Sequence, residues 1–260
     1  MRNVHPAALA GVLLNFALAW MLFAALANFD MSLLRPEDQE TMRAVIEAVQ
    51  AVKPVYYGLL ALQLIALAFI VLRVRFGLGL AAVAAFFMLP GSLIYIIGCA
   101  LTYYRVRYDG FSAPDKKDPY GGALFVYPSA WAPKARIATG VAMLSSLGAL
   151  LLGYHDIALV LFGVSLAGFY CAFRAGRHHA LALLRDAFVI VPDLFAPRLA
   201  VAYRDVREAT LLDDKIIFDL ETPGGARQLA WGLRSLDVRE RNEAVEELGA
   251  ALAAHHVSLR

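Results

Sequence analysis

The chain has 260 residues, of which 60% are hydrophobic and 18% are charged, and its formal net charge is +2. Soluble domains carry roughly 25% charged residues, so a chain of this size cannot hide so much apolar surface in a soluble core, and lipid is the indicated solvent. The near-neutral charge, without a concentrated basic patch, indicates no nucleic-acid partner.

The first apolar run begins close to the N-terminus. Residues 7–29 contain no charged side chain over 23 positions. About 20 apolar residues in a helix cross the hydrocarbon layer, so we expect a first span at about residues 6–29. Arg2 gives the segment the start of a secretory signal, but the run is longer than the roughly 7–15 residues of a signal core. We therefore expect an uncleaved membrane helix.

Residues 30–53 form a polar connection with helical character. Pro36 suits a first helical turn, and apolar residues then recur at helical spacing at Met42, Val45, Ile46, Val49 and Val52. This amphipathic helix would lie on the membrane surface or pack on a neighbouring domain. The alternative is that it merely extends the second span.

Four further spans are expected, at about residues 55–72, 76–104, 137–154 and 157–173. The span at 76–104 is interrupted by Pro90-Gly91. We expect one kinked helix there, because each half alone is too short to cross a membrane. A re-entrant hairpin is the alternative.

Basic residues in the connections predict the orientation of these spans, because cytoplasmic loops are enriched in Lys and Arg. With five crossings, one side carries three basic residues near the membrane, Arg2, Arg73 and Arg75. The other side carries twelve: Arg35, Arg43, Lys53, Arg105, Arg107, Lys116, Lys117, Lys134, Arg136, Arg174, Arg177 and Arg185. This ratio places the N-terminus outside and the C-terminal domain in the cytoplasm.

The hydrophobic period changes after residue 173. Short strands are expected at residues 187–191, 199–203, 206–212, 215–220 and 228–233, with turn signals between them. The end is an amphipathic helix with a stripe of Val245, Leu248 and Leu252. Strands followed by one such helix predict a small α+β unit in which the helix covers a sheet.

The phrase Val201-Ala202-Tyr203-Arg204-Asp205-Val206, the strand order and the closing helix resemble the bacterial PH-like domains, and among them the YcxB-like family. The resemblance implies a strand segment before a membrane hairpin, for which residues 102–109 and 123–127 are candidates. Residues 102–131 and 180–256 would then build one domain, which is interrupted by the fourth and fifth membrane spans. The family implies binding of protein or lipid, not catalysis, and it assigns no functional residue.

The expected organisation is thus a membrane α-helical protein of about five spans with a cytoplasmic α+β PH-like domain. Its parts are three spans in residues 1–104, a polar connection with strand-like segments in 105–136, two spans in 137–173, and a strand-rich domain in 180–256.

Two sets of residues are candidates for binding. Basic side chains just beyond a membrane helix attract anionic lipid, so we expect head-group contacts at Arg174, Arg177, His178 and His179. Aromatic side chains in or beside the strands would offer a surface to a partner protein, namely Tyr103, Tyr108, Tyr120 and Tyr203.

No motif for a catalytic site, a metal or a cofactor is visible, because the adjacent histidines lack further ligands at zinc spacing. We expect a non-enzymatic regulatory or accessory subunit of an envelope system, which binds a partner protein or membrane lipid through the domain. An immunity protein against a membrane-acting toxin is one alternative, and a transporter component is another.

Overall fold

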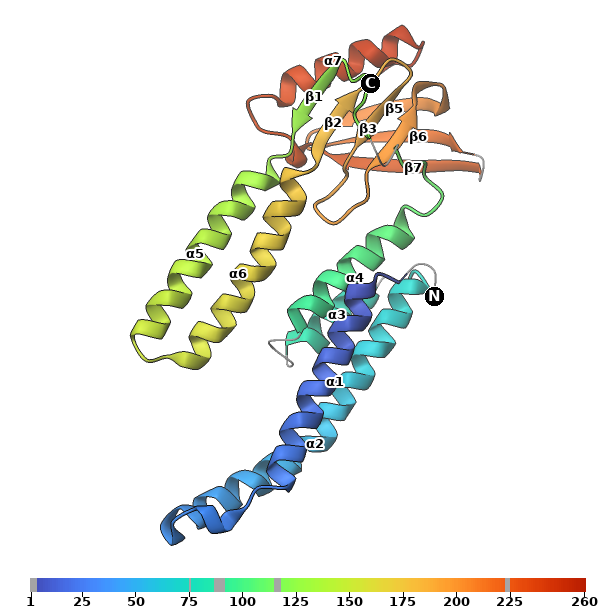
Figure 1. Ribbon diagram of the computed structural model, residues 1–260. Helices are drawn as coiled ribbons and strands as arrows, with labels where there is room; N and C mark the ends of the chain where they lie inside the picture. Colours follow the sequence, from blue (N-terminus) through green and yellow to red (C-terminus); the bar gives the residue numbers. More distant parts are fainter. Residues whose placement is uncertain (1–3, 75, 87–91, 115–117, 223–224) are drawn as a thin grey trace. The chain divides into compact units, whose positions relative to one another are not determined.

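The computed structural model describes residues 4–74, 76–86, 92–114, 118–222 and 225–260. The chain divides into two compact units, Met1–Val106 and Arg107–Arg260 (Figure 1). The first is helical, and the second joins a helical hairpin to a strand-rich domain.

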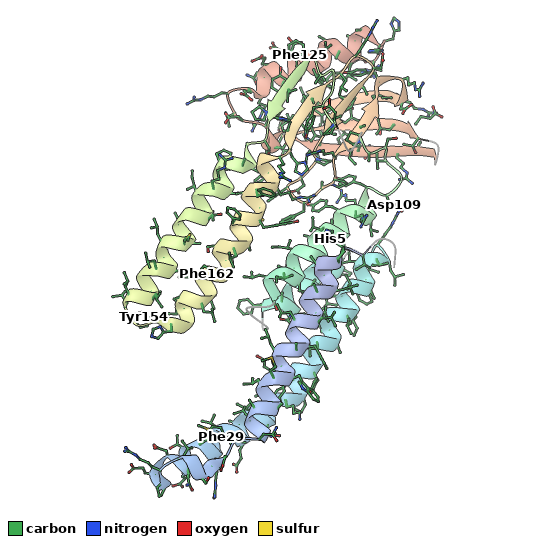
Figure 2. The ribbon with its side chains drawn as sticks, in the orientation of Figure 1. His5, Phe29, Asp109, Phe125, Tyr154 and Phe162 are labelled. Carbon is green, nitrogen blue, oxygen red and sulfur yellow. The ribbon has the colours of Figure 1, made fainter. Side chains whose placement is uncertain are left out.

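The first unit is built on two long helices, α1 (Pro6–Ala27) and α2 (Pro36–Val71), linked by the short 3-10 helix η1 (Met31–Leu33). The first span is confirmed as a helix, and His5 and Phe29 mark its two ends (Figure 2). The polar connection and the second span form one helix of 36 residues. The alternative in which the amphipathic segment extends the second span is therefore the one that the structure shows. Pro54 lies inside α2, where the missing backbone donor favours the bend visible in Figure 1.

The third apolar run does not form the single kinked helix that we expected. It forms two helices, α3 (Gly77–Phe86) and α4 (Ser92–Arg107). Pro90-Gly91 falls between them, outside the described residues.

α4 runs antiparallel to α1. The two helices meet at three pairs: Asn15 donates to Ser92 at 3.4 Å, Gly11 lies against Tyr95, and the His5 nitrogen donates to Thr102 at 3.0 Å. The numbering rises along one helix as it falls along the other. The end of α4 therefore lies beside the start of α1.

α3 begins at the same end of the first unit. A Cβ atom added to Gly77 would lie 2.7 Å from the Ile70 nitrogen, so α3 starts against the end of α2. Ile70 and Ala8 belong to one buried cluster near the start of α1. The start of α3 and the end of α4 therefore lie at the same end of the unit, as the re-entrant alternative requires.

The second unit contains an antiparallel hairpin of α5 (Trp131–Leu151) and α6 (His155–Gly176). Ser146 on α5 donates to the Ala158 carbonyl on α6 at 2.7 Å. The outer faces expose large apolar residues such as Leu144, Leu151 and Phe169. Tyr154 lies at the turn of the hairpin, far from Phe125 in the domain (Figure 2).

Three helices in the described residues are long and apolar enough to cross a membrane, namely Pro6–Ala27, Pro36–Val71 and Ile157–Gly176. α5 is not among them, and it carries Lys134 and Arg136 in its first turns. Helix α3 is apolar but shorter. The chain thus has the helices of a membrane protein together with a β domain.

Within the described residues, the domain has seven strands in two antiparallel sheets, with orders β1-β2-β3-β4 and β5-β6-β7. Their bounds are Phe125–Pro128, His179–Leu183, Ala187–Ile190 and Leu199–Ala202 for β1–β4, and Val206–Leu212, Lys215–Thr222 and Gly225–Gly232 for β5–β7. Helix α7 (Arg241–Ala254) contributes Ala244, Leu248 and Leu252 to the core that both sheets share. The predicted closing helix and five late strands are confirmed.

The domain begins before the helical hairpin of α5 and α6, as the expected strand at 123–127 required. β1 pairs with β2 across the insertion of α5 and α6, with Tyr127 opposite Leu181. The expectation for residues 102–109 is wrong, because α4 continues to Arg107 and packs as a helix. β2 was not predicted, since His179–Leu183 is buried over most of its length and shows no polar–apolar alternation.

Candidate functional site

A pocket of about 470 Å³ lies where α6 enters the domain. The last turns of α6, the start of β2, the β3–β4 loop and the segment after α4 all contribute to its wall. The lining residues are Ala113, Pro114, Tyr170, Phe173, Arg174, Arg177, His178, Pro197 and Arg198. We call this the basic pocket.

Arg174 holds the β3–β4 loop against α6. Its Nε donates to the Leu194 carbonyl at 3.1 Å, and its Nη2 donates to the carbonyls of Phe195 and Ala196 at 3.3 and 3.2 Å. A guanidinium presents several donors in a fixed plane, which suits three successive carbonyls. Arg174 is therefore chiefly structural, although its charge still faces the pocket.

Arg198 fixes the histidine of the pocket. Its Nε donates to Nδ1 of His178 at 2.7 Å, and its Nη2 donates to the Arg177 carbonyl at 2.8 Å. Because Nδ1 accepts, the neutral ring carries its proton on Nε2. Burial, followed by the charges of Arg198 and Arg174, lowers the pKa of His178 to about 4. The ring is neutral at physiological pH and offers a donor instead of a charge.

Arg177 is the most exposed of the three arginines. Its guanidinium lies over the Phe173 ring, 4.1 Å from the ring centroid. Such stacking orients the planar group while its donors stay available. Arg177 is thus placed to bind an anion.

The charge of the basic pocket is uncompensated among its described lining residues. Three arginines line it, and the described lining contains no aspartate or glutamate. The ion pairs recorded elsewhere in the domain, such as Arg207 with Glu221 at 2.8 Å, lie on exposed surface. A half-buried guanidinium such as Arg198 is costly without a counter-charge, so the arrangement favours an anionic ligand.

The predicted lipid-contacting residues divide into two groups. Arg174, Arg177 and His178 come together in the basic pocket. His179 does not line it, since its nitrogen donates to the Tyr120 hydroxyl at 3.0 Å and its backbone pairs with Pro128. Arg198 was missed, because it lies 20 positions beyond His178 in a loop with no basic cluster of its own.

The four tyrosines predicted to bind a partner differ in exposure. Tyr203 is 1% exposed in the core, and its ring stacks on His255 at 4.5 Å. Burial of apolar area favours this position, which leaves Tyr203 no surface to offer to a partner. Tyr103, Tyr108 and Tyr120 are half-buried: Tyr108 packs against the core, Tyr120 lies against His179, and Tyr103 packs on a helical cluster of the first unit. Their role in partner binding stays a prediction.

The two pairs of adjacent histidines, His178-His179 and His255-His256, do not belong to a metal site in the described part of the chain. Within the described residues, no three His, Cys, Asp or Glu side chains lie close enough together to hold a metal ion. His255 instead contacts the Arg185 carbonyl at 3.3 Å. The arrangement of the basic pocket suits binding of an anion by charge and hydrogen bonds.

Comparisons with protein-family models, with curated proteins and with solved structures find no match to this chain. The resemblance to the YcxB-like family therefore stays a prediction.

Proposed function

We propose that this chain is an integral protein of a bacterial inner membrane that acts by binding and not by catalysis. Its α+β domain lies on the cytoplasmic side and binds anionic lipid head groups where α6 leaves the membrane. The observation that carries this proposal is the basic pocket, which is lined by three arginines and a neutral histidine and has no carboxylate among its described lining residues.

The seven strands and the closing helix support a PH-like domain in this proposal. The insertion of a helical hairpin after β1 matches the order that the resemblance implied. The likeness concerns architecture, so it supports a binding role without naming a ligand.

The contacts of the first unit favour four crossings in place of five. α1, α2, α5 and α6 would cross, while α3 and α4 form a re-entrant hairpin. α4 ends beside the start of α1, and the domain follows α4 directly in the chain. We therefore propose that the N-terminus and the domain lie on the same, cytoplasmic side.

This topology differs from the orientation that the five-span interpretation implied, in which the N-terminus lay outside. Matched reporter fusions at Met1 and after Arg260 separate the two. The four-crossing proposal expects a cytoplasmic signal from both fusions. A periplasmic N-terminal reporter with a cytoplasmic C-terminal one would restore five crossings.

Lipid binding is tested on the full chain in neutral detergent. A ligand that binds the folded state raises the unfolding temperature by mass action. Phosphatidylglycerol should therefore stabilise the protein more than phosphatidylcholine does, and added salt should reduce the difference. Equal stabilisation by both lipids would refute the proposal.

A protein partner is the second candidate, and the edge of the first sheet favours it. β1 is an edge strand, and Leu124, Phe125 and Val126 are 68%, 42% and 40% exposed. Open apolar edges are surfaces on which another strand can pair. Affinity purification from native membranes in mild detergent, with mass spectrometry, would identify such a partner at stoichiometric amounts. The immunity and transporter alternatives stay predictions.

A further inference from the structure

A second cavity adjoins the basic pocket. It measures about 500 Å³ and runs between α5 and α6, lined by Arg136, Thr139, Gly140, Phe169, Ala172, Phe173, Gly176 and Arg177. Phe173 and Arg177 line both cavities. A charged pocket and a largely apolar groove therefore meet at one residue pair.

We propose that the two cavities together bind one anionic phospholipid. Its phosphate occupies the basic pocket near Arg177, Arg198 and His178, and an acyl chain lies in the groove between α5 and α6. This inference rests on the proposed lipid-binding function and specifies the ligand and both parts of its site.

The groove suits an acyl chain because aromatic rings line one wall and a glycine leaves space in the other. Phe169 and Phe173 supply apolar surface from α6. Gly140 opens the α5 side, since an added Cβ would meet nothing within 4 Å. Phe169 is 63% exposed on a helix long and apolar enough to cross a membrane, so the groove opens where lipid chains would lie.

The pocket suits a phosphate because Arg177, His178 and Arg198, which line it together, all carry hydrogen-bond donors. Arg198 commits Nε and one Nη2 bond to His178 and the Arg177 carbonyl, which leaves Nη1 without a recorded acceptor in the described chain. Nε2 of His178 is a neutral donor, as its Nδ1 accepts from Arg198. Guanidinium donors bind phosphate oxygens in pairs.

Helix electrostatics alone do not account for this cluster. Basic side chains favour a helix C-terminus, and that explains Arg174 and Arg177 at the end of α6. Arg198 comes from the β3–β4 loop, and its hydrogen bonds to His178 and to the Arg177 carbonyl bring a third guanidinium to this helix end. Three positive charges exceed the roughly half charge of a helix dipole, and a bound anion would offset their repulsion.

The test uses native mass spectrometry of the full-length protein in mild detergent, titrated with phosphatidylglycerol, phosphatidylcholine or glycerol 3-phosphate. Two variants address the two halves of the site, Arg177→Gln for the phosphate and Gly140→Leu for the acyl chain. Their matched controls are Arg239→Gln, on an exposed turn before α7, and Gly148→Leu, elsewhere on α5, where an added Cβ also meets nothing.

We expect phosphatidylglycerol to bind most tightly, and each site variant to weaken it roughly tenfold while both controls stay within about twofold of the parent. Equal binding of glycerol 3-phosphate would overturn the lipid assignment in favour of a soluble anion. A loss in Arg177→Gln without a loss in Gly140→Leu would overturn the acyl-chain site. Undiminished phosphatidylglycerol preference in both variants would overturn this inference while leaving the proposed function intact. No preference in the parent protein would refute both.

Discussion

The close packing of α1 on α4 predicts a large effect from one methyl group. A Cβ atom on Gly11 would lie 2.5 Å from both the nitrogen and the Cα atom of Tyr95, and 2.6 Å from its Cβ. Carbon atoms pack at about 3.5–4.0 Å, so Gly11→Ala requires the helices to separate by about 1 Å. Backbone atoms supply the obstacle, so no side-chain rotation relieves it.

The expected cost follows from two contributions. Overpacking a close contact costs about 1–3 kcal/mol. The same shift strains the bond from the buried Tyr95 hydroxyl to the Gln63 carbonyl, 2.7 Å long, whose loss costs roughly 0.5–1.5 kcal/mol. Alanine returns about 0.5–1 kcal/mol through its better helix propensity. The net destabilisation is therefore about 0.5–4 kcal/mol.

Thermal unfolding of the full chain in mild detergent measures this effect. The matched control is Gly79→Ala in α3, where an added Cβ meets nothing within 4 Å and only the propensity gain remains. Gly11→Ala should unfold several degrees below the parent, and Gly79→Ala at or above it. Equal unfolding temperatures for the two variants would show that α1 and α4 do not approach as closely as described.

Three further predictions concern the second unit. Tyr203→Phe should leave the free energy of unfolding unchanged or raise it by up to about 1 kcal/mol, because no described residue hydrogen-bonds the buried hydroxyl, whereas Tyr203→Ala should cost about 3–5 kcal/mol in denaturant unfolding. The pKa of His178 in the folded protein, about 4, lies below its ordinary 6.5. The stability that the neutral ring contributes should therefore be complete above about pH 6.5 and decline as the pH falls towards 4. In a pH series of unfolding temperatures, His178→Gln should remove that decline. A fragment of residues 173–260 lacks β1 and should not unfold cooperatively when followed by circular dichroism. A second fragment, in which a short Gly-Ser linker joins residues 107–130 to 177–260, should unfold cooperatively, because β1 pairs with β2 and brings Tyr127 into the core.

The late strands were predicted well because turn residues and alternating apolar residues, which are both visible over a few positions, define them. Turn signals at Asp213-Asp214 and Gly224-Gly225 bound strands whose apolar residues alternate, as in β6 with its buried Ile216, Phe218 and Leu220. β2 escaped prediction since it follows α6 after only two residues and is apolar on both faces. Such a run reads as the continuation of a membrane helix.

The candidate site was predicted only where it is contiguous in sequence. Arg174, Arg177 and His178 occupy the end of one helix, and the position of that helix end suggested lipid contact. Arg198 joins them only through the pairing of β3 with β4, which returns the loop to α6. The apolar groove likewise depends on α5 packing against α6, a tertiary contact that no local pattern reports.

The number of membrane crossings also depends on tertiary contacts that the sequence pattern does not report. In the four-crossing proposal, the domain's side gains Arg2, Arg73 and Arg75 and loses Arg35, Arg43 and Lys53, so the ratio of basic residues stays twelve to three. The charge rule therefore cannot choose between four and five crossings. The choice depends on whether residues 76–104 cross once or return, and the contact of Thr102 with His5 favours return.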